Sequence, residues 1–180
     1  IISTPKDSIE AGNILYTALL AKRPFVIRYS KDRLEYKKEN YQIVPIGSWR
    51  VITTGTDAVL ITYGSLLNHA TTIQKNLDHD ISLSIVNARY QKPIDTKMFE
   101  SILDKYKYIF IYEEQTYINS LGFYLLSYAN SHNYTGKIKI FAIKDEYVPQ
   151  GKKEEILALL KLDPISITNE ISSTIKSSNN

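Results

Sequence analysis

The sequence contains no cysteine in its 180 residues. The chain therefore forms no disulfide, has no thiolate nucleophile and offers no sulfur ligand to a metal ion. A chain without cysteine fits the cytoplasm, which is our expectation for its location. No apolar run approaches the roughly 18 residues that a membrane-spanning helix needs, so we expect no membrane partner.

Glycine is also scarce, and its placement excludes several common sites. The seven glycines are scattered, and neither G-x-G-x-x-G nor the P-loop pattern occurs, which disfavours a dinucleotide or nucleotide-hydrolase site. The turn Gly64-Ser65 lacks the G-x-S-x-G pattern of a hydrolase nucleophile, so an ordinary turn is the better interpretation.

Clusters of metal ligands are missing from the sequence as well. The three histidines, His69, His79 and His132, lie far apart, and none has a second histidine four residues away or a nearby group of carboxylates. Surface or helix-face histidines are the better interpretation, and we predict no metal site.

Charge of one sign does not accumulate along the chain. The 22 basic and 19 acidic residues give a net charge of +3 and are spread along the sequence, which argues against an extended nucleic-acid surface. Hydrophobic residues make up 43% and charged residues 23% of the chain. This composition is typical of a globular protein that buries a core of its own.

The first 30 residues predict a β-α-β unit. Ile1-Ile2 is predicted as a strand, and Thr4 is predicted as the N-cap of the following helix. In the competing register Asp7 is the N-cap and Glu10 is its partner. The second strand is predicted at 25–29. Residues 31–43 are charged and lack an apolar period, so we interpret them as a linker.

From residue 44 onward, strands and helices alternate. We predict strands at 48–53, 58–63, 81–86, 107–112 and 137–143, with helices at 65–77, 96–106, 119–132 and 152–161 and a short one at 167–175. This order predicts an α/β fold with a mostly parallel sheet between two helical layers. The short connection after 48–53 suits an antiparallel hairpin with the next strand.

Cations gather where the second strand ends. Arg28, Lys31 and Arg33 lie within six residues, at the carboxyl edge of the strand, where ligands of open α/β sheets usually bind. Cations there suit an anionic substrate such as a phosphate. The alternative is a solvated strand end, which the chemistry of these residues alone favours.

A second set of charges follows two later strands. Arg89 comes after 81–86, and Glu113 and Glu114 come after 107–112. If these strands are neighbours, Arg89 meets a glutamate at the carboxyl edge of the sheet. A structural ion pair is the simpler interpretation, and a ligand site is the alternative.

Several separated motifs resemble one enzyme family. They are TPKD and LYTAL (4–19), IRY (27–29), VPIG (44–47), NARYQKPID (87–95) and VPQG (148–151). In order and spacing they resemble the 1-deoxy-D-xylulose-5-phosphate synthases, and the resemblance covers essentially the whole chain. It implies that residues 1–30 end a pyrimidine-binding domain, 31–43 form a linker, and 44–180 form a transketolase-like C-terminal domain. We therefore expect a fragment that begins in mid-sheet.

The resemblance also implies a reaction. These enzymes condense pyruvate with glyceraldehyde 3-phosphate, with loss of carbon dioxide, in isoprenoid precursor synthesis. They use thiamine diphosphate and Mg²⁺ and form homodimers. The magnesium motif, the glutamate that activates the cofactor and the upstream catalytic histidine are absent from this sequence. We therefore assign no catalytic, cofactor-binding or metal residue, and expect the fragment alone to be inactive.

One family motif bears on the substrate. The pattern I-R-Y-P-R-G, whose second arginine holds the substrate phosphate, matches Ile27 to Asp32 here. Lys31 stands in place of that arginine, which keeps the charge but loses the bidentate fork. The resemblance thus assigns phosphate binding to Lys31, with Arg28 as a second cation. A glycine-rich turn of the family, G-G-x-G, keeps only Gly122, so we expect an altered backbone approach there.

Two other functions stay open. The chain is alternatively a non-catalytic dimerisation or interaction domain. It is alternatively related to transketolases or to the beta subunits of 2-oxo acid dehydrogenases, which share the general layout. Those subunits more often read I-D-L-R-T-x-x-P-L-D where this chain has the N-A-R run at 87–89.

Overall fold

The computed structural model describes residues 1–31, 35, 37 and 39–177. Part of the predicted linker 31–43, including Arg33, lies outside the described residues. The strands are β1 (Ile2–Ser3), β2 (Val26–Ile27), β3 (Arg50–Thr53), β4 (Ala58–Thr62), β5 (Leu83–Asn87), β6 (Tyr90–Lys92), β7 (Tyr108–Thr116) and β8 (Lys137–Ile143). The helices are α1 (Ser8–Ala21), α2 (Leu66–Asn76), α3 (Thr96–Lys105), α4 (Leu121–Ser131), α5 (Lys153–Leu159) and α6 (Pro164–Lys176). None of these helices is long and apolar enough to cross a membrane.

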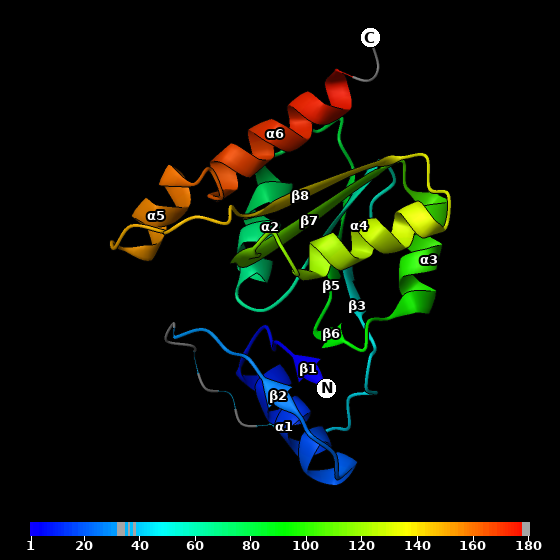
Figure 1. Ribbon diagram of the computed structural model, residues 1–180, viewed down its shortest axis with the longest axis vertical. Helices are drawn as coiled ribbons and strands as arrows, with labels where there is room; N and C mark the ends of the chain where they lie inside the picture. Colours follow the sequence, from blue (N-terminus) through cyan, green and yellow to red (C-terminus); the bar gives the residue numbers. More distant parts are fainter. Residues whose placement is uncertain (32–34, 36, 38, 178–180) are drawn as a thin grey trace.

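A five-stranded sheet in the order β3-β5-β4-β7-β8 forms the centre of the molecule. All neighbouring pairs are parallel except β3 with β5. One core joins the sheet to α2, α5 and α6, and a second core on the other face joins it to α3 and α4. Figure 1 shows these helices on either side of the sheet. The predicted three-layer fold with one antiparallel strand is confirmed.

The central strand explains why the sheet needs both helical layers. Every residue of β4 is buried, and successive side chains of a strand point to opposite faces. Ala58 and Leu60 accordingly pack in one core, and Val59 and Ile61 pack in the other. A run of apolar residues without alternation is typical of such a doubly covered parallel strand.

The predicted hairpin between β3 and β4 is wrong, because β3 pairs with β5 instead. Both sides of β4 are occupied by β5 and β7, so the connection must pass the start of β5. Asp57 holds this crossing, since its N–H donates to Ser82 O at 3.0 Å and its carboxylate accepts from Ser82 N–H at 2.7 Å. A Cβ atom at Gly55 would lie 2.4 Å from the backbone of Leu83, so the crossing requires glycine.

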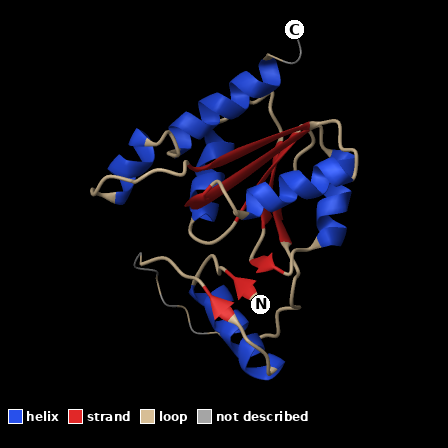
Figure 2. Cartoon of the chain, viewed as in Figure 1, coloured by secondary structure: helices blue, strands red, loops and turns tan. Residues whose placement is uncertain are grey.

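A separate three-stranded sheet, β2-β1-β6, lies with α1 beyond the large sheet (Figure 2). β1 is parallel to β2 and antiparallel to β6. The predicted β-α-β unit is confirmed, but β6 was not predicted. It is a three-residue strand within residues 87–95, which we assigned to no helix or strand, and its pairing with β1 rather than its own composition defines it.

Most predicted elements agree with the structure to within two residues at their ends, and the start of α1 decides between two registers. Asp7 is the N-cap, accepting from Glu10 N–H at 2.8 Å, while the Glu10 carboxylate accepts from Lys6 N–H at 2.8 Å. The arrangement resembles a capping box, except that Glu10 accepts from the residue before the N-cap and not from the N-cap itself. Thr4 as N-cap is therefore wrong, and the competing register is confirmed.

The last helix is longer than predicted. α6 begins at Pro164, three residues before the predicted start, because Asp163 caps it by accepting from Ile165 N–H and Ser166 N–H, each at 3.0 Å. Proline at the first helical position needs no hydrogen-bond partner. The helix therefore begins at the cap formed by the Asp163 carboxylate, whereas we predicted its start from the apolar residues that follow.

Candidate functional site

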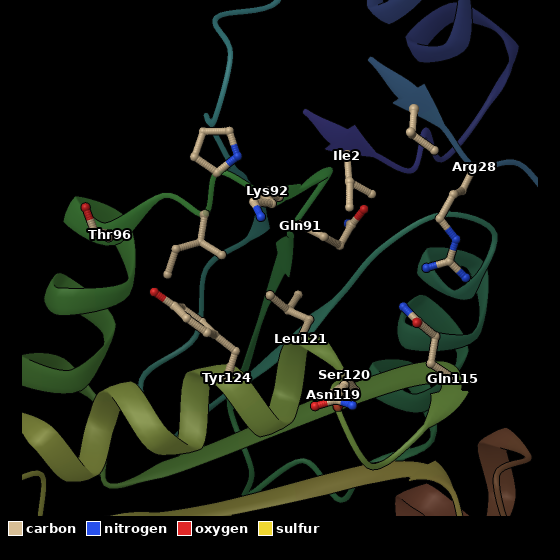
Figure 3. A pocket seen from close by; sticks show the side chains of 13 residues that line it. Ile2, Arg28, Gln91, Lys92, Thr96, Gln115, Asn119, Ser120, Leu121 and Tyr124 are labelled. Carbon is tan, nitrogen blue, oxygen red and sulfur yellow. The ribbon is translucent and has the colours of Figure 1, made fainter. Parts of the chain in front are cut away.

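A pocket of about 600 Å³ lies between the small sheet and the N-terminal end of α4 (Figure 3). Its walls come from β1, β2 and the β6–α3 segment on one side and from β7 and α4 on the other. The lining residues are Ile2, Val26, Arg28, Gln91, Lys92, Pro93, Ile94, Thr96, Gln115, Asn119, Ser120, Leu121 and Tyr124. The pocket is therefore built by segments far apart in the sequence.

Two cations belong to this pocket. Arg28 follows β2 and Lys92 ends β6, and no hydrogen bond or ion pair joins either side chain to another residue that the structure describes. No aspartate or glutamate is among the lining residues. Figure 3 shows the guanidinium group of Arg28 and the amide of Gln115 pointing toward one another. The pocket thus carries net positive charge.

Arg28 also reaches a second, smaller hollow. This pocket measures about 120 Å³ and is shared with Tyr29, Ser30, the Gly64-Ser65 turn and Glu114, among others. Lys31 is exposed and lines neither pocket. The structure therefore brings Arg28 to the carboxyl edge of the large sheet, where β4 and β7 end, and leaves Lys31 outside both pockets.

A buried carboxylate organises the floor of the site. Glu113 is fully buried and accepts hydrogen bonds from Gly122 N–H at 2.9 Å and from the Tyr63 hydroxyl at 3.1 Å. Gln115 donates its side-chain amide to the same Tyr63 oxygen at 2.9 Å. Burial and then the negative charge of Glu113 raise the pKa of Tyr63, so its hydroxyl stays protonated and can donate.

Gly122 keeps a close approach at the start of α4. A Cβ atom at this position would lie 2.7 Å from a carboxylate oxygen of Glu113. The single glycine left from the family's glycine-rich turn thus allows the contact between α4 and Glu113. A close approach of the α4 backbone to Glu113 is therefore present at Gly122, and the expected change relative to the family's turn stays a prediction.

The predicted meeting of Arg89 with Glu113 or Glu114 is wrong. β4 lies between β5 and β7, so the strand ends that carry these residues are not neighbours. Arg89 instead approaches Glu10 of α1, with 3.6 Å between a guanidinium nitrogen and a carboxylate oxygen. Glu114 pairs with Lys153 at 3.0 Å. A structural ion pair exists as expected, with a different glutamate.

Three pocket residues escaped the sequence analysis. Lys92 belongs to β6, the strand that was not predicted, and Gln115 lies beyond residue 112, where we ended the strand that the structure extends to Thr116. Tyr124 lies on α4 and is 54% exposed. A sequence signal was present only for Lys92, which lies inside the N-A-R-Y-Q-K-P-I-D run, and we used that run as a family signature.

The carboxylates around the site do not suit a magnesium ion. Glu10 is paired with Arg89, Glu114 is paired with Lys153, and both oxygens of Glu113 accept hydrogen bonds. Throughout the described part of the chain, no three histidine, aspartate or glutamate side chains gather to hold a metal ion. The residues present therefore do not fit a magnesium-diphosphate group.

The sequence of the chain is similar to that of known proteins. The model of the family "Transketolase, C-terminal domain" matches residues 47–167. The chain belongs to this family. A 1-deoxy-D-xylulose-5-phosphate synthase of Chlamydia trachomatis serovar L2 is 31% identical over 181 residues, covering 98% of this chain and 28% of that protein. The synthase of Clostridium botulinum strain Alaska E43 is 31% identical over 172 residues, covering 94% of this chain and 28% of that protein.

Solved structures agree on the fold. A split-gene transketolase, described as an inactive beta4 tetramer, matches with a TM-score of 0.85 and 18% identity, covering 97% of this chain and 58% of that one. A mutant transketolase of Pichia stipitis matches with a TM-score of 0.70 and 15% identity, over 97% of this chain and 25% of that one. The chain thus spans 28% of the length of its curated relatives.

Proposed function

We propose that this chain is the C-terminal part of a 1-deoxy-D-xylulose-5-phosphate synthase. We call the longer protein the parent. The observation that carries the proposal is the likeness to the synthases at 31% identity, which extends over 98% of the chain and therefore well beyond residues 47–167. In this proposal the parent is a cytoplasmic homodimer that condenses pyruvate with glyceraldehyde 3-phosphate and releases carbon dioxide.

The domain division is part of the proposal. Residues 1–30 end the pyrimidine-binding domain, 31–43 link the domains, and 44–180 form the C-terminal domain. The separate small sheet and the apolar cluster beside it support this division. The two parts are interlocked, because β6 and Val44 of the C-terminal domain complete the sheet and the cluster of the first part.

Thiamine diphosphate supplies an electron sink for pyruvate decarboxylation when it is bound. Because the carboxylates described here are engaged elsewhere, the proposal assigns the cofactor and its Mg²⁺ to other parts of the parent. The chain by itself is then expected to show no saturable binding of thiamine diphosphate with Mg²⁺ in calorimetry and no turnover. Saturable binding to the chain alone would contradict this assignment.

The proposal gives this chain a part in binding the triose phosphate. Lys31 supplies a mobile positive charge at the carboxyl end of β2, and Arg28, three residues earlier, adds a second cation. The exposure of Lys31 supports this role, since its ammonium group is free to meet a phosphate. Arg23 is also exposed, but it precedes β2, at the opposite end of the strand, and lines neither pocket.

The test uses the full-length parent with thiamine diphosphate and Mg²⁺. Carbon dioxide release from pyruvate is measured against the concentration of glyceraldehyde 3-phosphate for wild type, Lys31→Ala and the control Arg23→Ala. We expect Lys31→Ala to raise the triose-phosphate KM about tenfold, the loss expected for one charge-assisted contact, with little change in kcat. Lys31→Arg should restore the KM. An unchanged KM in Lys31→Ala would remove this residue from the site.

A non-catalytic role in assembly is the second candidate. The observation that favours it is the similarity in fold to a split-gene transketolase described as an inactive tetramer. In this case the parent would form a stable oligomer, measured by light scattering, and release no carbon dioxide from pyruvate under any of the conditions above.

A further inference from the structure

We propose that the pocket between the small sheet and α4 binds a small organic anion, one whose phosphate or carboxylate is joined to a flat apolar body. Arg28 is shared with the triose-phosphate site proposed above, whereas Lys31, the first residue of that site, does not line the pocket. The charge and the walls of the pocket suit such a ligand whether or not the parent is active.

The charge of the pocket is not balanced within the chain. Arg28 and Lys92 make no ion pair with any described residue. An unpaired guanidinium presents two parallel N–H groups that match a phosphate or a carboxylate. An anionic group is therefore the complementary ligand.

The nearest buried carboxylate does not take the place of such a ligand. Both oxygens of Glu113 are used by Gly122 N–H and by the Tyr63 hydroxyl. Tyr63 in turn accepts from Gln115, which holds that side chain against the floor of the pocket. Gln115 faces Arg28 in Figure 3. The side chain of Gln115 is thus held in place before a ligand arrives.

The remaining walls are apolar and suit a flat body. Val26 and Tyr124 are 52% and 54% exposed, and Ile2, Ile94 and Leu121 complete the surface that they line. A volume of about 600 Å³ lies within the range of about 300–1,000 Å³ typical of small-molecule sites. A ligand that is only an anion would leave these side chains in water, so an apolar or aromatic body is part of the inference.

The experiment titrates the 180-residue chain with phenyl phosphate and with phenylacetate, followed by NMR chemical shifts. Benzyl alcohol is the uncharged control and inorganic phosphate is the control without an apolar body. We expect at least one of the two aromatic anions to bind with a dissociation constant of about 1 mM or lower. The anion that binds more tightly shows whether the site prefers a phosphate or a carboxylate.

Variants locate the site. Arg28→Ala should weaken binding about tenfold, while Arg23→Ala and Lys31→Ala should leave it unchanged. Arg28 is exposed, so its replacement should also leave thermal unfolding unchanged, which checks the fold. The inference is overturned if neither aromatic anion binds saturably, if benzyl alcohol or inorganic phosphate binds as tightly, or if Lys31→Ala weakens binding as much as Arg28→Ala does. Failure of triose-dependent carbon dioxide release in the parent would overturn the proposed function and leave this site standing.

Discussion

The large region, residues 47–177, and the small region, residues 1–30, are stabilised in different ways. The large region has two apolar cores, one on each face of its sheet. The small region shares a cluster of three buried residues, Ile14, Val44 and Tyr90, and only Ile14 is its own. It also leaves large apolar side chains in solvent, namely Leu15, Leu19, Leu20 and Val26, at 53%, 73%, 51% and 52% exposure.

Polar contacts therefore position the small region. Glu10 is buried at the boundary and accepts from Asn87 at 3.0 Å, beside its ion pair with Arg89. Arg89 also donates to the backbone oxygen of Ser48 at 2.9 Å. Since apolar burial is scarce on the side of the small region, this network fixes its place, and with it the place of Arg28 at the pocket.

The largest effect is expected in the core of the large region. Phe110 is 1% exposed and stacks on Phe141 with a centroid separation of 6.0 Å. We expect Phe110→Ala to lower the free energy of unfolding by about 4 kcal/mol, because it leaves a cavity between the sheet and its helices. Urea denaturation measures this loss. The matched control Phe123→Ala, at a residue that is 43% exposed, should cost about 0.5 kcal/mol.

Breaking the boundary network should release the small region alone. Glu10→Ala removes the acceptor of the Asn87 amide and the charge partner of Arg89, which keeps its hydrogen bonds to Ser48. The loss of one partner of a buried pair costs about 3 kcal/mol. We expect faster hydrogen exchange of the amides of α1, with the amides of β4 unchanged. The control is Glu154→Ala on the exposed face of α5. Equal acceleration in α1 and β4 would show that the two regions unfold as one unit, against the comparison drawn here.

The Tyr63–Glu113 contact stabilises the large region at the floor of the pocket. Tyr63→Phe removes one of the donors to Glu113 and the acceptor of Gln115, and we expect a loss of about 1.5 kcal/mol in stability at pH 7. Urea denaturation of the variant and of wild type gives this difference. A loss as large as that of Phe110→Ala would show that the floor of the pocket, rather than the apolar core, dominates the large region.

Tyr63→Phe should also change how stability depends on pH in the alkaline range. Burial raises the pKa of Tyr63 above its ordinary value of 10.0, so above about pH 10 the unfolded chain loses a proton that the folded chain keeps. Stability is therefore fully present below pH 10 and falls as the pH rises further. Urea denaturation at pH 9 and pH 11 should show a smaller decline in Tyr63→Phe than in wild type. An equal decline would show that Tyr63 does not titrate differently on folding.

The smallest effect concerns the cap of α1. Burial raises the pKa of Asp7, but the side chain of Lys6 and the N–H of Glu10 lower it more, so the net pKa falls below 3.8. The stabilisation is present above pH 3.8 and is lost as the pH falls through the folded pKa. Asp7→Ala should cost about 1 kcal/mol at pH 6, measured from amide exchange in α1. The difference in thermal stability from wild type should shrink toward pH 2.

The sequence predicts those features that local pattern determines. Strand β8 is predicted at its observed bounds, 137–143, and the layers follow from alternation of elements. Features that depend on contacts between distant segments were missed. Connection length predicted the antiparallel direction of β3 but not its neighbour, and β6 exists because β1 lies beside it.

The candidate site shows the same limit. Arg28 was predicted at the carboxyl edge because its position follows directly from the end of a strand, and it lies there. Lys92 reaches the pocket from β6, which forms only because it pairs with β1. Gln115 reaches it from the end of β7, which pairing with β8 extends beyond the predicted end. The partner of Arg89 was missed because Glu10 is 79 positions away in the numbering and meets it only through tertiary packing.

The central claim is that this chain belongs to an enzyme that joins pyruvate to a triose phosphate. The most direct measurement is carbon dioxide release from pyruvate by the full-length parent, with thiamine diphosphate and Mg²⁺, with and without glyceraldehyde 3-phosphate. Our account predicts release that depends on the triose phosphate, with formation of 1-deoxy-D-xylulose 5-phosphate in equal amount. Absence of release, or release unaffected by the triose phosphate, would contradict it.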